Sequence, residues 1–193
     1  MRFGETSIAG AFVLDIERFE DERGFFARVS CVREFSEHGL AAAIMQTSIA
    51  YNRKKGTLRG LHYQAPPGRE AKYVRCTRGA ILDVVVDIRP NSPSFLRHIA
   101  VELTADNRRG LYVSPGLAHG YQTLTDDTEV FYQMSDYHAP ELARGFRWDD
   151  PAFGIAWPDG PRIINSRDNG YPPFSTDAVE ELRVHYPGEV GTR

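Results

Sequence analysis

The stretch Ala80-Ile81-Leu82-Asp83-Val84-Val85-Val86-Asp87-Ile88 is the longest β-rich run in the sequence. Its valine and isoleucine side chains pack well on a pleated surface and favour a strand. Turn-forming residues follow at once in Arg89-Pro90-Asn91-Ser92-Pro93, where a strand should end. The run therefore predicts a strand that ends near Ile88.

Shorter β-rich runs lie on both sides of this stretch. They are Ala11 to Ile16, Lys72 to Cys76, Arg97 to Leu103, Gly110 to Val113 and Glu129 to Met134. Short strands at such spacing, separated by turn signals, predict an all-β sandwich or barrel. Two short helices are expected at Val32 to Gly39 and at Ser175 to His185, the second capped by Ser175 or Thr176. Residues 140–193 are richer in proline, glycine and aspartate and predict a less regular covering segment.

Length and composition are those of an ordinary globular protein. A chain of 193 residues fits one domain, residues 1–193, with 41% hydrophobic and 25% charged residues. The net charge is -3, and no basic run exceeds Arg53-Lys54-Lys55. Binding to the phosphate backbone needs a concentrated positive face, so nucleic acid is not expected as a partner. A small molecule is expected instead.

No targeting or membrane signal is visible in the sequence. The first residues contain no apolar core of a signal peptide, and no stretch reaches the roughly 18 apolar residues of a membrane span. A cytoplasmic location without a membrane partner is therefore expected. Cys31 and Cys76 are too few for a disulfide framework, and neither has the spacing of a metal or redox motif.

The segment Gly56-Thr57-Leu58-Arg59-Gly60-Leu61-His62-Tyr63-Gln64 places a histidine beside glycine, where a ligand can approach closely. Strict alternation would put Leu58, Gly60, His62 and Gln64 on one face of a strand and the other four residues from Thr57 to Tyr63 on the opposite face. An imidazole exchanges protons near neutral pH and can act as a general base. A hydrogen-bonded structural histidine is the alternative.

Two further residues could carry chemistry from neighbouring strands. Lys72 shares a face with Val74 and Cys76, and is either a rim residue with its ammonium in solvent or a cation held for an anionic intermediate. Tyr132 shares a face with Val130 and Met134, which is typical of an inward-facing residue. It is either part of the core or a phenol that donates a proton inside the barrel.

Several separated motifs together resemble those of the dTDP-4-dehydrorhamnose 3,5-epimerases of the cupin superfamily. The resemblance runs from about Asp15 to about Phe174. Its motifs are Asp21 to Phe26, Gly56 to Gln64, Ala71 to Cys76, Asp83 to Arg89 with Ser92-Pro93, Ser114 to Tyr121, Trp148 to Pro151, Ile155 to Pro158 and Ser166 to Asp168. This resemblance implies a double-stranded β-helix, or jelly-roll barrel, with a few short helices.

The resemblance also implies a reaction and a role for each catalytic residue. A proton next to a sugar ketone is removed and returned on the opposite face, which inverts carbon 3, carbon 5 or both. His62 would be the base, Asp168 its orienting carboxylate, Tyr132 the acid and Lys72 the stabiliser of the enolate oxygen. The implied substrate is a nucleotide-linked 4-keto-6-deoxy sugar, with no cofactor.

Substrate binding and assembly are implied in the same way. The residues implied to bind substrate are Arg23, Phe26, Gln46, Ser48, Arg59, His119, Tyr137 and Arg167. Family members are typically homodimers that exchange N-terminal strands, so Arg23 would act in the partner's site. Four positions depart from the commonest pattern: Arg28 and Ala143 replace glutamates, Ser48 replaces asparagine and Arg167 replaces lysine.

Several alternatives stay open at the level of the sequence. They are an epimerase that acts at one carbon or on a GDP- or CDP-linked sugar, a ketoisomerase of the same barrel, and a cupin that binds a sugar nucleotide without catalysis. Metal binding is not expected, because Gln64 occupies the position two residues after His62 where a metal-binding cupin has a second ligand.

Overall fold

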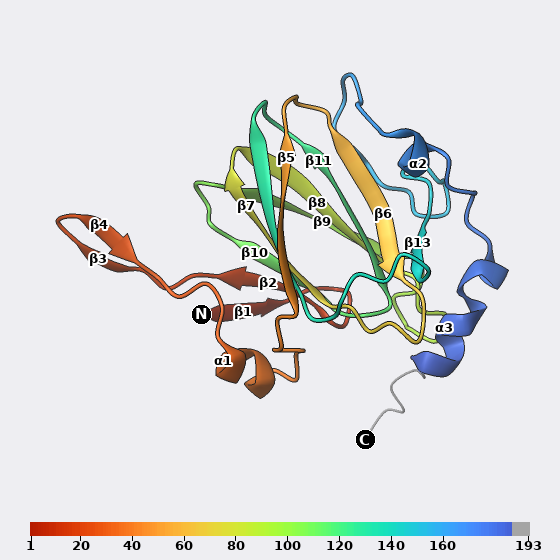
Figure 1. Cartoon of the computed structure of the whole chain (residues 1–193), viewed down its shortest axis with the longest axis horizontal. Helices are drawn as coiled ribbons and strands as arrows, with labels where there is room; N and C mark the ends of the chain where they lie inside the picture. The colour runs from red at the N-terminus through yellow and green to blue at the C-terminus, as the bar shows by residue number, and fades with distance from the viewer. Residues whose placement is uncertain (187–193) are drawn as a thin grey trace.

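Two antiparallel β-sheets lie face to face and form the body of the protein (Figure 1). The computed structural model describes residues 1–186, so the last seven residues of the expected single domain and covering segment lie outside the described residues. The six-stranded sheet contains, in spatial order, β1 (Arg2–Glu5), β2 (Ala11–Asp15), β10 (Gly110–Val113), β7 (Lys72–Arg78), β12 (Thr128–Met134) and β5 (Gln46–Asn52). The five-stranded sheet contains β13 (Ala143–Gly145), β6 (Leu58–Gln64), β11 (Leu117–Thr123), β8 (Ala80–Asp87) and β9 (His98–Thr104).

The remaining elements lie outside these two sheets. A hairpin of β3 (Phe19–Asp21) and β4 (Gly24–Phe26) projects from the body on the left of Figure 1. The helices are α1 (Val32–Glu37), α2 (Ser166–Asn169), the 3₁₀ helix η1 (Thr176–Val179) and α3 (Glu180–His185). Most neighbouring strands in both sheets are not consecutive in the sequence, as the order β6-β11-β8 illustrates.

The all-β fold class predicted from the sequence is confirmed. Each of the six β-rich runs forms a strand whose ends lie within two residues of the expected ones. Both expected helices are present, and the second begins as a 3₁₀ turn capped by Ser175, whose side chain accepts a hydrogen bond from the backbone N–H of Ala178 at 3.3 Å. The predicted strand at Ala80 to Ile88 is β8, which is central to the five-stranded sheet.

The hydrophobic core has three parts. The space between the sheets is filled by β-branched and aliphatic side chains such as Val74, Val85 and Leu111. The outer face of the five-stranded sheet is covered by the segment after β13, whose Phe146 and Leu182 are buried there. The outer face of the six-stranded sheet is covered around Phe35 of α1. Both outer faces of the sandwich and the space between its sheets are therefore packed with apolar side chains.

The less regular covering segment expected after residue 140 is confirmed for its described part. Between β13 and α2 the chain has no long helix or strand, yet it is tied to β6 by backbone hydrogen bonds of Ile163 with Leu58 (2.9 Å) and Gly56 (2.9 Å). Phe153 and Trp157 pack on the same outer face. This segment carries α2 to the back of β6.

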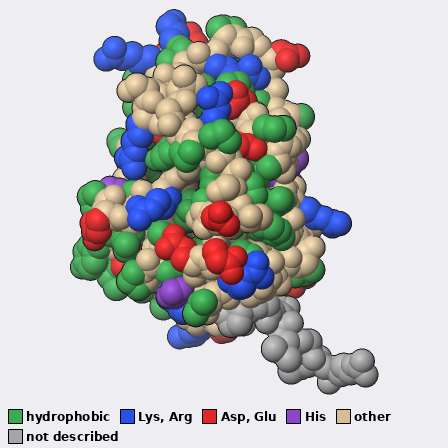
Figure 2. All heavy atoms as spheres, turned by 90° about the vertical axis from the view of Figure 1, so that its right-hand side faces the viewer, with side chains coloured by type: hydrophobic (Ala, Val, Ile, Leu, Met, Phe, Trp, Pro, Cys, Tyr) green, Lys and Arg blue, Asp and Glu red, His purple; other side chains and the backbone are tan. Residues whose placement is uncertain are grey.

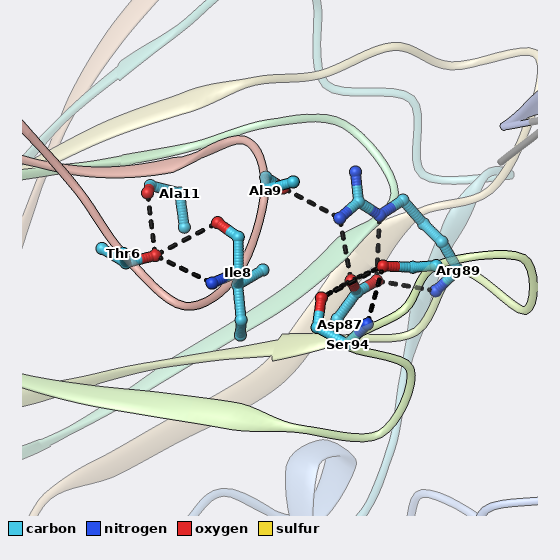
Figure 3. Close-up of polar contacts among 8 residues, drawn as sticks. Thr6, Ile8, Ala9, Ala11, Asp87, Arg89 and Ser94 are labelled. Carbon is cyan, nitrogen blue, oxygen red and sulfur yellow. Dashed lines mark hydrogen bonds and ion pairs between the residues drawn. The ribbon is translucent and has the colours of Figure 1, made fainter. Parts of the chain in front are cut away.

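The loop between β8 and β9 is held by a buried carboxylate (Figure 3). Asp87 accepts hydrogen bonds from Nε of Arg89 at 2.9 Å and from Oγ of Ser94 at 2.6 Å. Arg89 also donates to the backbone oxygen of Ala9 at 2.8 Å, which joins this loop to the turn before β2. These contacts therefore tie the loop after β8 to the turn before β2.

The surface shown in Figure 2 carries acidic and basic side chains interspersed around a strip of hydrophobic ones, without a continuous basic surface on this face. None of the helices within residues 1–186 is long and apolar enough to cross a membrane.

Candidate active site

A cavity of about 400 Å³ lies at the end of the barrel, between strands of both sheets. Five of the residues predicted for the site line it: Gln46, Ser48, His62, Lys72 and Arg167. Among its lining residues three are cationic, Lys72, Arg144 and Arg167, and one, Glu70, is acidic. The wall therefore carries net positive charge, which favours an anionic ligand.

His62 and Asp168 come together although 106 positions separate them in the sequence. Oδ1 of Asp168 lies 2.8 Å from Nε2 of His62, and Oδ2 accepts a hydrogen bond from the backbone N–H of Gly60 at 3.2 Å. The His62 side chain is 40% exposed and that of Asp168 only 2%. The carboxylate therefore lies behind the imidazole, which faces the cavity.

Local sequence explains why Asp168 sits there. Asn165 begins α2, and its side chain accepts a hydrogen bond from the backbone N–H of Asp168 at 2.7 Å. Asp168 is thus fixed in the first turn of a helix that rests against β6. Both carboxylate oxygens are used, one to hold the imidazole and one to hold its strand.

The pKa of Asp168 reflects two opposing effects. Burial raises it, but the hydrogen bond from His62 and the backbone N–H of Gly60 outweigh burial and hold the pKa below its usual value. A lowered folded-state pKa stabilises the fold above the usual carboxyl range, and this contribution is lost as pH falls through the lowered value. Asp168 is therefore ionised at neutral pH, as an orienting partner of imidazole must be.

Strict alternation along β6 is broken at Gly60, which corrects the sequence-based assignment of faces. The pairing of β6 with β11 shifts register between the partners His62 and Arg59. Leu58 lies in the outer core with Leu61, while Arg59 donates from Nε to Asn52 at 2.9 Å on the inner side. Arg59 and His62 therefore face the interior, and Leu58 does not share a face with His62.

Gly60 is needed at this break because of close backbone approach. A Cβ atom at this position would lie 2.5 Å from Cα of Gly120 on β11, and the φ angle of Gly60 is +125°. No larger residue fits without moving β6 or β11. The contact between Gly60 and Gly120 thus sets the position of His62, which lies two residues after Gly60.

A second histidine and aspartate pair lies deeper in the barrel. Nε2 of His119 on β11 lies 2.6 Å from Oδ1 of Asp83 on β8, and both side chains are buried. Oδ2 of Asp83 is buried without a hydrogen-bond partner within residues 1–186. The sequence singled out His119 but not Asp83, although an aspartate inside an apolar strand was a usable signal.

Tyr132 lies beside this pair, as expected from alternation along β12. Its ring centroid is 6.4 Å from that of His119 and 6.5 Å from that of Tyr121. Val130 belongs to the interior core and Met134 lines the cavity, which confirms the shared face. Burial raises the pKa of Tyr132 well above its usual range, and the neighbouring Tyr121 raises it further. The phenol therefore holds its proton.

Lys72 begins β7 at the rim of the cavity and forms an ion pair with Glu70. The other predicted binding residues surround this rim. Gln46 accepts from the backbone N–H of His138 at 2.6 Å, Ser48 is the register partner of Tyr132, and Tyr137 is 65% exposed. Arg167 precedes Asp168 in α2 and is exposed.

Arg23 and Phe26 are not brought to the cavity within this chain. They belong to the projecting hairpin, where the Arg23 side chain is 83% exposed and Phe26 is 73% exposed. Arg23 contacts Asp21 of the same hairpin at 2.5 Å. Neither residue therefore contributes to the cavity of its own chain.

Sequence reasoning missed several residues of the site. Glu70, Arg144 and His138 line the cavity, and the ring of Tyr171 lies edge-on to His62 with centroids 6.0 Å apart. Glu70 lies two positions before Lys72, the first residue of β7, a spacing that would place both on one face of an extended chain. The position of Tyr171 follows only from the path of the covering segment.

No group of three or more histidine, cysteine, aspartate or glutamate residues in the described part of the chain could hold a metal ion. The position that would supply a second ligand next to His62 is Gln64, whose side chain accepts from the backbone N–H of Ala139 at 3.3 Å. The expectation that activity needs no metal stays a prediction.

An antiparallel barrel whose cavity is lined by an ammonium group and by a histidine paired with an aspartate, with a partly buried phenol in the barrel interior, defines a cupin-type protein equipped for proton transfer. Comparison with known proteins narrows this class. Residues 5–176 match the family described as dTDP-4-dehydrorhamnose 3,5-epimerase. The chain belongs to this family of isomerases.

Individual relatives agree with that assignment. The dTDP-4-dehydrorhamnose 3,5-epimerase of Sinorhizobium fredii is 37% identical over 173 residues, which cover 89% of each chain. The crystal structure of the Bacillus anthracis enzyme of the same name, with TDP and PPi bound, has a TM-score of 0.86 and 34% identity, covering 90% of this chain and 99% of that one. A 3'-monoepimerase from Streptomyces bikiniensis in complex with dTDP-quinovose has a TM-score of 0.82 and 34% identity, and the match covers 92% of this chain and 89% of that one.

Proposed function

We propose that this protein converts a dTDP-linked 4-keto-6-deoxy sugar into its epimer at carbons 3 and 5, giving dTDP-4-dehydrorhamnose for deoxysugar or cell-surface polysaccharide synthesis. The observation that carries the proposal is the pair of His62 and Asp168, 2.8 Å apart at the wall of a cavity with net positive charge. The Bacillus anthracis relative was solved with TDP bound, which supports a thymidine-linked substrate.

Proton removal is assigned to His62. The Nε2 atom of His62 lies against Asp168, so the other ring nitrogen, Nδ1, is the one free to take a proton from the sugar. The ionised Asp168 stabilises the imidazolium that forms. The enolate left behind needs a cation, and Lys72 on the cavity wall supplies one.

Proton return is assigned to Tyr132. Inversion requires a proton from the face opposite to the base, and a second group must provide it. Tyr132 comes from the six-stranded sheet, whereas His62 comes from the five-stranded sheet, so the two approach the space between the sheets from different sides. A phenol whose pKa is raised by burial is protonated and ready to donate.

Nucleotide and sugar binding is assigned to the residues around the cavity. Arg167, Gln46 and Ser48 line it and can donate hydrogen bonds to phosphate or sugar oxygens. Arg59 and His119 lie in the barrel interior, bonded to Asn52 and Asp83, and exposed Tyr137 offers an aromatic face. The serine at position 48 and the alanine at position 143 set this pocket apart from the commonest pattern of the family.

The test uses deuterated water with dTDP-, GDP- and CDP-linked 4-keto-6-deoxy sugars. NMR of each product locates deuterium and reports the nucleotide and the inverted carbons at once. Deuterium at carbons 3 and 5 of the dTDP sugar supports the proposal. Exchange at no carbon of any of these sugars would contradict it.

A second candidate activity is epimerisation at carbon 3 alone. The Streptomyces bikiniensis 3'-monoepimerase matches this chain at 34% identity, the same value as the Bacillus anthracis enzyme. Overall identity therefore does not separate the two activities. Deuterium confined to carbon 3 in the same experiment would select the monoepimerase.

Activity is expected to persist in full after exhaustive chelation, because the imidazole and ammonium groups of the cavity supply the proton transfer and positive charge that the reaction needs. The measurement is turnover before and after treatment with a chelator and buffer exchange. Loss of activity that an added divalent metal restores would disprove this expectation.

The protein is further proposed to be a homodimer in which the β3–β4 hairpin reaches the partner. Phe19 and Phe26 are 68% and 73% exposed on this projecting hairpin, an apolar surface that an isolated monomer would leave in water. Strand β5 is an unpaired sheet edge, with Ile49 62% exposed, and can accept further strands. A second copy supplies a cover for both features.

Light scattering at micromolar concentration is expected to give about twice the monomer mass. Arg23→Ala should raise KM by about tenfold through the partner's site, as expected for a lost charge-assisted contact to phosphate. The matched control is Arg33→Ala, which removes an exposed arginine of α1. A monomer with full turnover, or an Arg23→Ala variant with unchanged KM, would disprove the dimer role of the hairpin.

We also propose that the enzyme forms one domain over residues 1–193 and acts in the cytoplasm. Cys31 and Cys76 are free thiols, which fits a reducing compartment. Cell fractionation with an antibody against the protein tests the location.

A further inference from the structure

Glu70 is an acid in a cavity whose other charged groups are cationic. Its side chain is 7% exposed, and that of Lys72, with which it pairs, is 17% exposed. Both residues line the cavity that contains His62. Within residues 1–186 the Glu70 carboxylate makes no hydrogen bond or ion pair other than the one with Lys72.

Other acidic and basic residues two positions apart differ from this pair. Asp87 and Arg89 also form hydrogen bonds with neighbouring groups, Asp87 with Ser94 and Arg89 with the backbone of Ala9, and these bonds fix a loop (Figure 3). Arg147 and Asp149 are 37% and 35% exposed, so water screens them. Unlike these two pairs, Glu70 and Lys72 are shielded from water and also line a cavity large enough for a ligand.

A nearly buried carboxylate is costly unless it is paired, so Glu70 has a strong reason to hold the ammonium. An ammonium group has three N–H donors on a flexible four-carbon chain. One donor directed at Glu70 fixes the direction of Nζ and leaves two for a ligand. Substrate can therefore bind to Lys72 without breaking the ion pair.

We propose that Glu70 is a positioning residue that holds Nζ of Lys72 toward the cavity, so that two of its N–H groups are aimed at the oxyanion formed on the sugar. This inference rests on the proposed function for the nature of the oxyanion. In this proposal the reaction requires Glu70 as the hydrogen-bond acceptor for Nζ of Lys72. It does not require Glu70 to supply a proton. Glutamine at position 70 should then serve nearly as well as glutamate, whereas alanine should not.

The kinetics of three variants test whether position 70 needs a hydrogen-bond acceptor. Glu70→Ala is expected to lower kcat by about 10- to 100-fold with little change in KM, because misaligned stabilising groups act on the transition state. Glu70→Gln should recover most of the wild-type kcat. Asp149→Asn, which breaks an ion pair of the same spacing outside the cavity, should match wild type. Equal loss in the alanine and glutamine variants, or wild-type kcat in Glu70→Ala, would overturn the proposal.

A spectroscopic test needs no substrate, so it separates failure of this inference from failure of the proposed function. The sequence contains three lysines, Lys54, Lys55 and Lys72, and the first two are exposed. Protein labelled with ¹³C at lysine Cε gives few signals, and Lys72→Arg assigns the relevant one. Two resolved Hε signals are expected for Lys72 in wild type and in Glu70→Gln, and one averaged signal in Glu70→Ala. An averaged signal in wild type, or two resolved signals in Glu70→Ala, would overturn the proposal even if the enzyme proved inactive on every nucleotide sugar tested.

Discussion

His62→Ala should abolish both deuterium exchange and inversion, with a loss of about 10²- to 10⁴-fold in kcat, the range for removal of a general base. Without the imidazole no group at this point of the cavity takes the proton, and no enolate forms. The measurement is deuterium incorporation at carbons 3 and 5, followed by NMR in deuterated water. Deuterium incorporation at carbon 3 and at carbon 5 should fall together if one base serves both carbons.

His185→Ala is the matched control, because His185 is an exposed residue at the end of α3 and its ring contacts the backbone of Glu181 rather than the cavity. It should exchange deuterium at the wild-type rate. A His62→Ala variant that folds and still exchanges at either carbon at the wild-type rate would remove His62 from the mechanism.

Tyr132→Phe should separate exchange from inversion. The substitution keeps the ring among His119 and Tyr121 and deletes only the hydroxyl, so the fold should survive. His62 can still remove a proton and return deuterium to the same face, whereas delivery from the opposite face fails. We expect exchange to persist at one carbon at least, while inversion falls by about 10²- to 10⁴-fold.

Tyr186→Phe is the control for loss of a phenol, since Tyr186 packs on the outer core away from the cavity. Near-UV circular dichroism checks that both variants keep their packing. Inversion of both carbons by Tyr132→Phe at the wild-type rate would show that Tyr132 is a core residue only. The proposed mechanism would then need a different acid.

The strands were predictable because their hydrophobic runs and turn residues are local signals. Each expected run, including Ala80 to Ile88, is a strand in the structure. Alternation failed at Gly60, because a shift in pairing with β11 depends on the close approach of Gly120, 60 positions away. Arg59 thus lies inside the barrel, whereas strict alternation predicted it on the strand face opposite to His62.

The candidate site was predictable in its residue types but only partly in its partners. The motif around His62 pointed to a base, and the resemblance supplied Asp168 as its partner. Asp83 and Glu70 went unnoticed, because their importance comes from burial beside His119 and Lys72, and burial depends on the whole fold. The projecting hairpin with Arg23 and Phe26 lies away from the cavity of its own chain, so its proposed role rests on the proposed dimer.

The covering segment after β13 has a consequence for how the enzyme loses activity on heating. It carries Asp168 but contributes little regular structure of its own, and it is attached to β6 through a few backbone bonds and an apolar layer. Such a layer can detach by local opening while both sheets remain intact. Thermal inactivation should then precede loss of the β-sheet signal, and a short cooling period should restore activity without refolding of the barrel.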